Sequence, residues 1–398
     1  MSDEQLAIHG GKPVRNAYLP YGKQVLDEDD IQSVVQVLKS DYLTTGPVIQ
    51  QFEQDMANLT GAKYAVAFSN GTAALHAACF AAGISEDDEV ITTPMTFAAS
   101  ANCVLYQGGK PVFVDIHPDT YNINSMSIKE KITKHTKAII PVHFTGQPAD
   151  MDEIMKIARE NQLIVIEDAA HALGAMYKNQ KIGSIGDMTM FSFHPVKHIT
   201  TGEGGIITTN QEDFYKKLIQ FRTHGITREP NIMRENHGPW YYEMQFLGYN
   251  YRITDIQVAL GVSQLKKLET FIQKRKQLVE LYMEELKNMD EIELPKQLPY
   301  VESSWHLFVL KLQLSKLTVG RKEIFEALQK ENIGVNVHYL PVYLHPYYQT
   351  LGFTKGICPI AEKSYEEFLT LPLFPGMDEG DVMDVVRGLK KVIKYYRK

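Results

Sequence analysis

A lysine enclosed by apolar residues and a glycine-rich turn is the residue best suited to covalent chemistry in this 398-residue sequence. Lys197 follows an apolar stretch that ends at Phe193 and precedes the sequence GEGG at positions 202–205. Burial disfavours a charged lysine, and a neutral amine can form a Schiff base with a carbonyl group. The glycines leave room for a planar ring, and Ser192 offers a hydroxyl to a phosphate. The alternative is a solvated surface lysine, the usual environment of this residue type.

Two carboxylates, Glu167 and Asp168, end the apolar run LIVI and stand shortly before His171. In parallel sheets, ligands lie beyond the carboxyl ends of the strands. An ionised carboxylate there can pair with a protonated ring nitrogen, as in pyridoxal-phosphate enzymes, where the charged ring acts as an electron sink. Alternation along the strand does not decide which carboxylate faces the ligand. Capping of the following turn is the alternative role for Asp168.

Two further polar segments precede predicted helices. The sequence SNGTA at 69–73 combines small residues, the Thr72 hydroxyl and the positive end of a helix, which together suit a phosphate. It is neither a P-loop nor a GxGxxG motif, which argues against nucleotide hydrolysis and a Rossmann dinucleotide site. The sequence GYNYR at 248–252 stands before Asp255 and another helix. For both segments the alternative is an ordinary helix cap.

These residues lie on an alternation of short apolar runs and longer amphipathic segments. Continuous apolar strands separated by helices predict an α/β fold, with a mostly parallel central sheet flanked by helices. The predicted helices include Thr72–Ala82, Phe97–Leu105 and Met151–Asn161. The predicted strands are Tyr64–Phe68, Glu89–Thr92, Pro111–Val114, Lys137–Val142, Leu163–Glu167, Met188–Phe193 and Gly205–Thr209.

The pattern changes near Leu265, which predicts two domains. Residues 1–265 are expected to form the large domain, and residues 266–398 a smaller α+β domain. The second part contains predicted helices at 266–287, 321–331 and 381–397 and a strand-like run, Trp305–Leu314. The segment before Gly61 is compatible with packing on either domain.

Composition limits the class of protein. A net charge of −7 without a basic tract gives no support for binding to nucleic acid or a membrane surface. The three cysteines, Cys79, Cys103 and Cys358, form no CxxC pair, so neither a disulfide framework nor a metal site is expected. No signal-peptide pattern and no apolar run of transmembrane length are visible, so a cytoplasmic protein is expected.

Taken together, the motifs resemble those of the nucleotide-sugar aminotransferases of the DegT/DnrJ/EryC1/StrS family, which are fold-type I enzymes that use pyridoxal 5'-phosphate (PLP). The resemblance covers nearly the whole chain, and the ordered co-occurrence of many short motifs is more specific than any one of them. In chain order the motifs are LTTGP at 43–47, NGTAAL at 70–75, TPMTF at 93–97, EDAAH at 167–171, Lys197 with GEGG at 202–205, YNYR at 249–252, VHYLPV at 337–342 and LPLFP at 371–375.

The resemblance implies a role for each chemical group near the cofactor ring. Lys197 would hold PLP as a Schiff base and later move a proton between the substrate carbon and the cofactor carbon. Asp168 would pair with the pyridine nitrogen, and Phe97 would stack on the ring. His338 and Tyr339 would line the pocket for the nucleotide sugar.

The resemblance also implies how the phosphate is held. Gly71, Thr72 and Ser192 would bind it from the same chain, and Asn250 would reach it from a second subunit, which makes an obligate homodimer with shared active sites. His171 would lie near the ring and its hydroxyl, at a position where many relatives have glutamine. No metal is implied.

The lysine segment most resembles the enzymes of pseudaminic acid synthesis, which implies transfer of an amino group from L-glutamate to C4 of a UDP-linked 4-keto-6-deoxy-N-acetylhexosamine of L configuration. Another UDP- or dTDP-4-keto-6-deoxy sugar is the near alternative. Some relatives are dehydratases with histidine in place of the lysine, so an alignment of His198 with that position would favour dehydration. The sequence is also compatible with a lyase, with a desulfurase that uses Cys358, and with a non-catalytic binding protein.

Overall fold

The computed structural model describes residues 5–398, so residues 1–4 of the predicted large domain lie outside the described residues. Its centre is a seven-stranded sheet in the order β1-β9-β8-β5-β4-β2-β3. The bounds are β1 Tyr64–Phe68, β2 Glu89–Thr92, β3 Lys110–Phe113, β4 Thr136–Ile140, β5 Ile164–Asp168, β8 Met188–Ser192 and β9 Gly205–Thr209. The seven predicted strands are therefore all present, with ends shifted by at most two residues.

Six of these strands run in the same direction. β9 is antiparallel to both of its neighbours, β1 and β8, and the other pairings are parallel. The prediction of a mostly parallel sheet is confirmed. The carboxyl ends of six strands consequently meet at one edge of the sheet, together with the amino end of β9. Every loop that carries a predicted cofactor-binding residue of the large domain, except that of Asn250, leaves the sheet at this edge.

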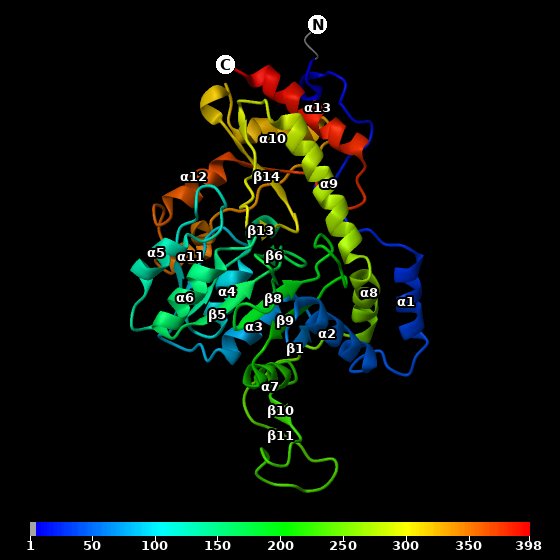
Figure 1. Cartoon of the computed structure of the whole chain (residues 1–398), viewed down its shortest axis with the longest axis vertical. Helices are drawn as coiled ribbons and strands as arrows, with labels where there is room; N and C mark the ends of the chain where they lie inside the picture. Colours follow the sequence, from blue (N-terminus) through cyan, green and yellow to red (C-terminus); the bar gives the residue numbers. More distant parts are fainter. Residues whose placement is uncertain (1–4) are drawn as a thin grey trace.

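Helices cover both faces of the sheet (Figure 1). Alternate residues of β1 show the division, because Ala65 and Ala67 belong to one apolar cluster and Val66 and Phe68 to another. The first cluster includes residues of α2 (Pro47–Thr60), α6 (Met151–Asn161) and α8 (Asp255–Leu265). The second includes residues of α3 (Gly71–Ala81), α4 (Ala99–Tyr106) and α7 (Glu212–Phe221).

The C-terminal part builds a second, smaller layer. Its antiparallel sheet has the order β12-β14-β15, with bounds Ile292–Glu293, Phe308–Leu312 and Phe368–Leu371. Three long helices pack around it: α9 (Leu268–Leu286), α10 (Arg321–Lys330) and α13 (Glu379–Tyr396). The predicted strand Trp305–Leu314 is shorter than expected, and the domain boundary at residue 265 stays a prediction.

The N-terminal segment divides between the two parts. Leu6 and Leu19 join the apolar cluster of the C-terminal part, whereas Ile49 and Phe52 join that of the central sheet. Between them, α1 (Glu28–Leu38) packs against α8 at the side of the molecule (Figure 1).

A narrow arm projects from the body beyond α7 (Figure 1). It contains the two-stranded sheet of β10 (Ile226–Thr227) and β11 (Glu243–Met244). The remaining elements are short: β6 Met176–Tyr177, β7 Gln180–Lys181, β13 Val301–Glu302, α5 Ser125–Ile128, α11 Pro346–Thr350, α12 Pro359–Glu367, and 3-10 turns at Ala7–His9, Lys129–Lys131, Phe144–Gly146, Leu314–Lys316 and Val342–Leu344. Within residues 5–398, no helix is long and apolar enough to cross a membrane.

Candidate active site

Lys197 lies in the loop that joins β8 to β9. The two strands are paired at Ser192 and Gly205, and the loop is closed further by a hydrogen bond from the Phe193 N–H to the Gly204 carbonyl, 2.9 Å. Lys197 itself is part of a turn, since its N–H donates to the His194 carbonyl at 2.9 Å. The loop is therefore fixed at both ends and presents the lysine at the ligand edge of the sheet.

The environment of Lys197 favours a neutral amine. Burial lowers the pKa of Lys197 to about 8, and the nearby charge of Asp168 acts in the opposite direction. Among residues 5–398, no hydrogen bond or ion pair within 4 Å occupies the Lys197 Nζ atom. A partly buried amine with this pKa has a substantial neutral fraction near pH 7 to 8, which is the form that attacks a carbonyl.

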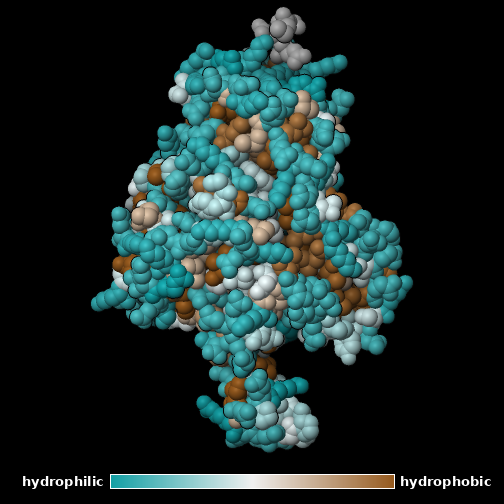
Figure 2. Space-filling view, in the orientation of Figure 1, coloured by the Kyte–Doolittle hydropathy of each residue, from teal (hydrophilic) through white to brown (hydrophobic). Residues whose placement is uncertain are grey.

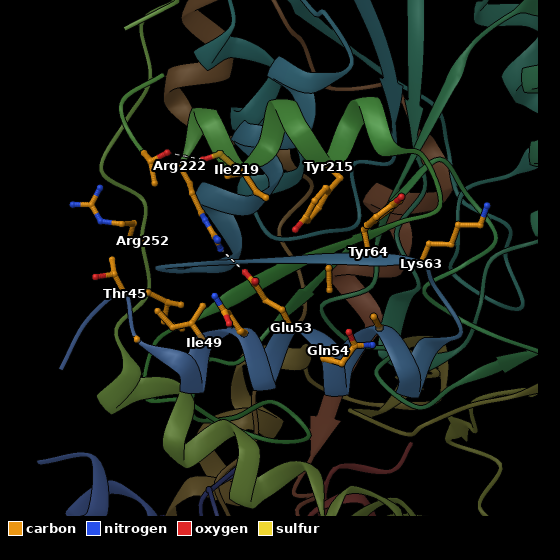
Figure 3. A pocket seen from close by; sticks show the side chains of 16 residues that line it. Thr45, Ile49, Glu53, Gln54, Lys63, Tyr64, Tyr215, Ile219, Arg222 and Arg252 are labelled. Atoms are coloured by element: carbon orange, nitrogen blue, oxygen red, sulfur yellow. Dashed lines mark hydrogen bonds and ion pairs between the residues drawn. The ribbon is translucent and has the colours of Figure 1, made fainter. Parts of the chain in front are cut away.

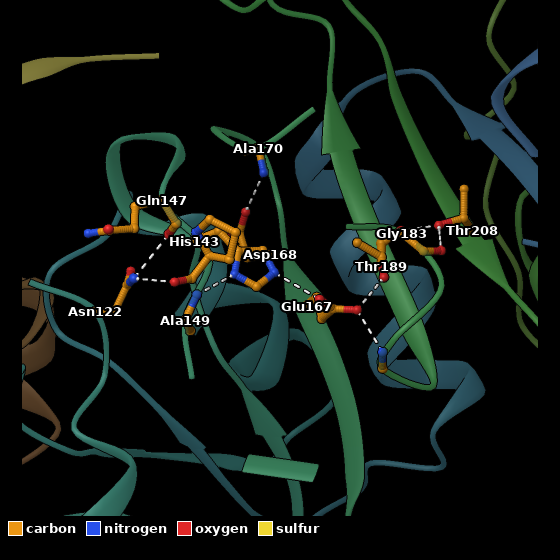
Figure 4. Close-up of polar contacts among 12 residues, drawn as sticks. Asn122, His143, Gln147, Ala149, Glu167, Asp168, Ala170, Gly183, Thr189 and Thr208 are labelled. Carbon is orange, nitrogen blue, oxygen red and sulfur yellow. Dashed lines mark hydrogen bonds and ion pairs between the residues drawn. The ribbon is translucent and has the colours of Figure 1, made fainter. Parts of the chain in front are cut away.

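The structure separates the roles of the two neighbouring carboxylates. Glu167 is fully buried and engaged on all sides: Oε1 accepts from the Gly186 N–H and the Thr189 hydroxyl, both at 2.7 Å, and Oε2 is 2.8 Å from His143 Nε2 (Figure 4). His143 Nδ1 accepts from the Ala149 N–H at 3.0 Å, so the ring proton is on Nε2 and points at Glu167. Glu167 is thus a structural residue of the sheet.

Asp168, on the opposite side of the same strand, is the carboxylate close enough to influence Lys197. It is 5% exposed. Its Oδ1 accepts from the Ala170 N–H at 3.1 Å, and its Oδ2 accepts from the Ser100 hydroxyl at 2.6 Å. Both oxygens are held, and the carboxylate stays in position without a basic side chain within 4 Å among the described residues.

The turn before α3 has free donors. The Asn70 side chain caps the helix by accepting from the Ala73 N–H at 2.8 Å, so the ordinary cap considered for this segment is present. Within the described residues, however, neither the N–H groups of Gly71 and Thr72 nor the Thr72 hydroxyl has a partner. The Ser192 hydroxyl, at the end of β8, accepts only a long hydrogen bond, 3.5 Å, from the His194 N–H.

Close approach explains the glycines around this turn. A Cβ at Gly205 would lie 2.6 Å from the carbonyl group of Asn70, and one at Gly71 would lie 3.2 Å from Met190 Sδ and 3.3 Å from Ser192 Cβ. Neither position accommodates a larger side chain without displacement of its neighbours. Unpaired donors at a helix N-terminus, with no side chain in front of them, form a cradle suited to a phosphate.

Phe97 and His171 approach the same edge from different loops. Phe97, two residues before α4, is 64% exposed, which is unusual for a phenylalanine. His171 is buried, its Nε2 is 3.2 Å from the Tyr339 hydroxyl, and its Nδ1 has no partner within the described residues. Burial lowers the pKa of His171 well below its usual value, and the charge of Lys197 adds to this effect.

The C-terminal part supplies the other predicted pocket residues. The Tyr339 hydroxyl reaches His171, and His338 Nδ1 is 2.8 Å from the Thr370 hydroxyl. Burial, with a smaller effect of Lys197, lowers the pKa of His338 to about 3, so this imidazole is neutral. The two residues predicted to line the substrate pocket therefore lie at the junction of the two parts of the chain.

Sequence reasoning missed His306, which also lies in this group. Its ring centroid is 4.4 Å from that of His171 and 5.4 Å from that of His198. His198 donates its Nε2 proton to the Ser304 carbonyl at 3.1 Å, which turns it toward the C-terminal part. A single histidine in a strand-like run, WHLF, does not indicate a functional site. It is also more than one hundred positions from Lys197, so the sequence does not show that the two lie close together.

Asn250 is not brought to the other residues within one chain. It is exposed and forms an isolated bridge with Thr223, and no contact joins it to Lys197, Asp168 or Ser192 within the described residues. Nearby, Asp255 accepts from the N–H groups of Gly46 and Val48 at the start of α2, 2.7 and 3.0 Å.

A separate cavity of about 440 Å³ lies on the outer side of β1, between α2 and α7 (Figure 3). Its walls include Glu53, Tyr64, Tyr215, Arg222 and Arg252, and Lys197 is not among them. This cavity is therefore not the place of the predicted covalent chemistry.

Comparisons with known proteins identify the family of the chain. Residues 24–390 match the model of the DegT/DnrJ/EryC1/StrS aminotransferase family. The chain belongs to this family.

Similar members of the family include two curated proteins. The chain is 46% identical to the uncharacterized protein MJ1066 of Methanocaldococcus jannaschii, over 96% of this chain and 100% of that protein. It is 41% identical to the spore coat polysaccharide biosynthesis protein SpsC of Bacillus subtilis, over 96% and 98%. Among solved structures, the Helicobacter pylori aminotransferase PseC, involved in the biosynthesis of pseudoaminic acid, superposes with a TM-score of 0.89 at 32% identity and covers 95% of this chain and 100% of that one.

Members of the DegT/DnrJ/EryC1/StrS family use PLP, and the chain is a PLP-dependent sugar aminotransferase. The residues at the sheet edge fit this cofactor: an amine of lowered pKa, a held carboxylate, and a glycine cradle with free donors. When bound, PLP supplies an electron-withdrawing ring that stabilises negative charge on the carbon next to the transferred nitrogen.

The structure also bears on the desulfurase alternative. Cys358 is fully buried beside Tyr343, whose hydroxyl accepts from the Cys358 N–H at 3.1 Å. Burial raises the pKa of the Cys358 thiol above its usual value, which disfavours the thiolate that a nucleophile requires. Among residues 5–398, no group of three or more His, Cys, Asp or Glu side chains is arranged to hold a metal ion.

Proposed function

We propose that this sugar aminotransferase transfers an amino group from L-glutamate to C4 of a UDP-linked 4-keto-6-deoxy-N-acetylhexosamine, as in pseudaminic acid synthesis. The placement of Lys197 between Asp168 and the junction with the C-terminal part supports amino transfer. The likeness to PseC, over nearly all of both chains, supports the choice of sugar. The cytoplasm remains our predicted location.

In this proposal each residue acts at a stated atom. Lys197 Nζ would hold PLP and, as a positioned general base and acid, would move a proton between the substrate and cofactor carbons. Asp168 would hold the proton on the ring nitrogen, and Phe97 would cover one ring face. The neutral imidazole of His171 would lie beside the ring hydroxyl.

The phosphate is held by both chains of a homodimer. Gly71 and Thr72 donate from the start of α3, and Ser192 donates from the end of β8. Asn250 of the partner subunit completes the set, which accounts for its exposed position away from Lys197 in its own chain. Tyr339 and His338 contact the nucleotide sugar.

A second sugar has support from a different observation. Identity to SpsC, a protein of spore coat polysaccharide biosynthesis, is 41%, higher than the 32% identity to PseC. Another UDP- or dTDP-4-keto-6-deoxy sugar is therefore the second candidate. Dehydration is less favoured, because Lys197 rather than His198 faces Asp168.

The deciding experiment is a glutamate-dependent amination assay with a panel of UDP- and dTDP-4-keto-6-deoxy sugars, followed by NMR of the product at C4. We expect the UDP-linked N-acetylated sugar to react at the highest kcat/KM and to give the L-configured amine. Preference for a dTDP sugar or the opposite configuration would replace the first candidate by the second. Release of water without incorporation of nitrogen would exclude both.

A further inference from the structure

The carboxylate of Asp168 is held by a hydroxyl that belongs to a different loop. Ser100 Oγ lies 2.6 Å from Asp168 Oδ2, and both residues are buried, with Ser100 fully inaccessible. The Phe97 carbonyl is a more distant acceptor, at 3.3 Å. Both oxygens can only accept, and the single hydroxyl proton of Ser100 points at the closer one, Asp168 Oδ2. The hydrogen bond is short and charge-assisted, the class of hydrogen bond that contributes most to stability.

A second hydroxyl orients the first. Thr96 Oγ1 lies 2.6 Å from Ser100 Oγ, and Thr96 is also buried. Because the Ser100 proton is directed at Asp168, Thr96 must donate to Ser100. The chain Thr96 to Ser100 to Asp168 therefore carries all its donors toward the carboxylate, an arrangement in which each hydrogen bond polarises the next.

The same segment carries the aromatic ring that is expected to cover the cofactor. Phe97 lies between Thr96 and Ser100 in the sequence, and its carbonyl accepts from the Ser100 N–H at 3.2 Å, at the start of α4. One turn of the chain thus carries both the Phe97 ring and the Ser100 hydroxyl that donates to the Asp168 carboxylate. An ordinary helix start does not require a hydrogen bond from Thr96 to Ser100 and another from Ser100 to the buried Asp168.

We propose that Ser100, oriented by Thr96, is a positioning residue that fixes the ionised carboxylate of Asp168 against the ring nitrogen of PLP. The inference rests on the role of Asp168 given above. Loss of the Ser100 hydroxyl leaves one carboxylate oxygen without its donor, which weakens the hold of Asp168 on the ring proton. Because a protonated ring withdraws electrons from the nitrogen that joins Lys197 to the cofactor, a weaker hold makes that nitrogen more basic.

The test compares Ser100→Ala with the wild-type enzyme loaded with PLP. We expect kcat to fall roughly 10- to 100-fold, the equivalent of one hydrogen bond to a charged group, while KM for the sugar stays within about threefold. The pH midpoint of the visible absorbance band should move upward. Ser100→Thr, which retains the hydroxyl, should restore the midpoint, and Thr96→Val should move it in the same direction by a smaller amount.

A matched control is Thr208→Val, which removes another buried hydroxyl, bonded at 2.7 Å to the Gly183 carbonyl and away from Asp168. It should leave the midpoint unchanged. If Asp168→Asn moves the midpoint and Ser100→Ala does not, the proposal for Ser100 is wrong and the role of Asp168 stands. If Asp168→Asn moves nothing, the assigned role of Asp168 fails as well.

Thermal melting of each apoprotein separates positioning from loss of structure. A Ser100→Ala protein that melts like the wild type and shows the shifted midpoint supports the proposal. If Ser100→Ala does not fold, Thr96→Val decides, because it leaves the Ser100 hydroxyl in place. An unshifted midpoint in folded Thr96→Val would then count against the proposal.

Discussion

A lysine is a nucleophile only when its amine is uncharged, but in water near neutral pH the charged form predominates. The partly buried position of Lys197 lowers its pKa to about 8, whereas an exposed lysine would keep most of its protons up to about pH 10. The fold thus makes the amine available at physiological pH before any ligand arrives.

We therefore predict that the rate at which PLP attaches to the apoenzyme rises with pH and levels off above a midpoint near 8. The neutral fraction of Lys197 increases as pH rises through its pKa, so the sign of the dependence is fixed. Stopped-flow recording of the absorbance band across the range from about pH 6 to about pH 10.5 measures it. Lys197→Arg, which keeps the charge but forms no such band, is the control, and a midpoint close to 10.5, the ordinary value for lysine, would contradict the prediction.

Glu167 illustrates a carboxylate that the chain uses only as an acceptor. All its contacts come from donors: an N–H group, a hydroxyl and the Nε2 proton of His143. We predict that Glu167→Gln lowers the free energy of unfolding by about 1–3 kcal/mol, because the new amide group faces one of these donors. Urea unfolding measures the change. Glu366→Gln, at an exposed position, should change it by less than about 0.5 kcal/mol.

At the scale of residues, local pattern and motif predicted Lys197 and the pair of carboxylates but not every role. The structural role of Glu167 follows from its hydrogen bonds with Gly186 and Thr189. Alternation along one strand does not reveal these partners. Ser100 was missed because its partner, Asp168, is 68 positions away in the sequence.

Among the elements, β1 is an edge strand, and side chains occupy the free backbone groups of one of its residues, Ala67. The N–H of Ala67 donates to Glu53 Oε1 at 2.8 Å, and the Ala67 carbonyl accepts from Arg222 Nη1 at 2.7 Å. Arg222 and Glu53 also form an ion pair with each other. Two side chains, one from α2 and one just after α7, thus replace the missing neighbouring strand.

We predict that Glu53→Gln and Arg222→Met each destabilise the protein, by about 2–4 kcal/mol, because each leaves a half-buried charge without its partner. The double variant should lose less than the sum, with a coupling of about 1–3 kcal/mol. Thermal or urea unfolding of the four proteins measures the cycle. Additive losses would show that the pair does not act as a unit.

The elements themselves were largely predictable. Strands such as Tyr64–Phe68 and Gly205–Thr209 are apolar runs with clear ends, and the structure has them at the predicted bounds. The direction of β9 was not predicted, because composition does not record which way a strand runs. Two-residue strands such as those of the arm were not found, since so short a segment has no period.

At the scale of the whole molecule, apolar side chains are exposed at several places, and two of these contain groups of large ones. One is the region of α1, where Leu26, Ile31 and Leu38 are each at least 49% exposed, and Figure 2 shows apolar surface gathered nearby around α8. The other is the arm, where Trp240 is 71% and Leu247 74% exposed. Such surface is typical of a protein that associates with another copy of itself.

We predict that the protein sediments as a dimer of two 45.2 kDa chains. Leu247→Asp should shift it toward the monomer at micromolar concentration, and PLP affinity should fall with it, because Asn250 of the partner subunit would be lost. Analytical ultracentrifugation and cofactor titration measure the two effects. Lys322→Asp, in α10 of the C-terminal part, is the control. A Leu247→Asp dimer with unchanged PLP affinity would argue against the shared site.

The pairing of Ser192 with Gly205, which closes the loop between β8 and β9, has a consequence for how such enzymes diversify. The chain leaves the sheet at Ser192 and returns at Gly205 directly opposite, so the reactive amine belongs to an excursion whose ends are already secured. The scaffold can therefore persist when the amine is exchanged for another group. A substitution at the lysine can therefore change the reaction that the enzyme catalyses without changing the fold of the sheet.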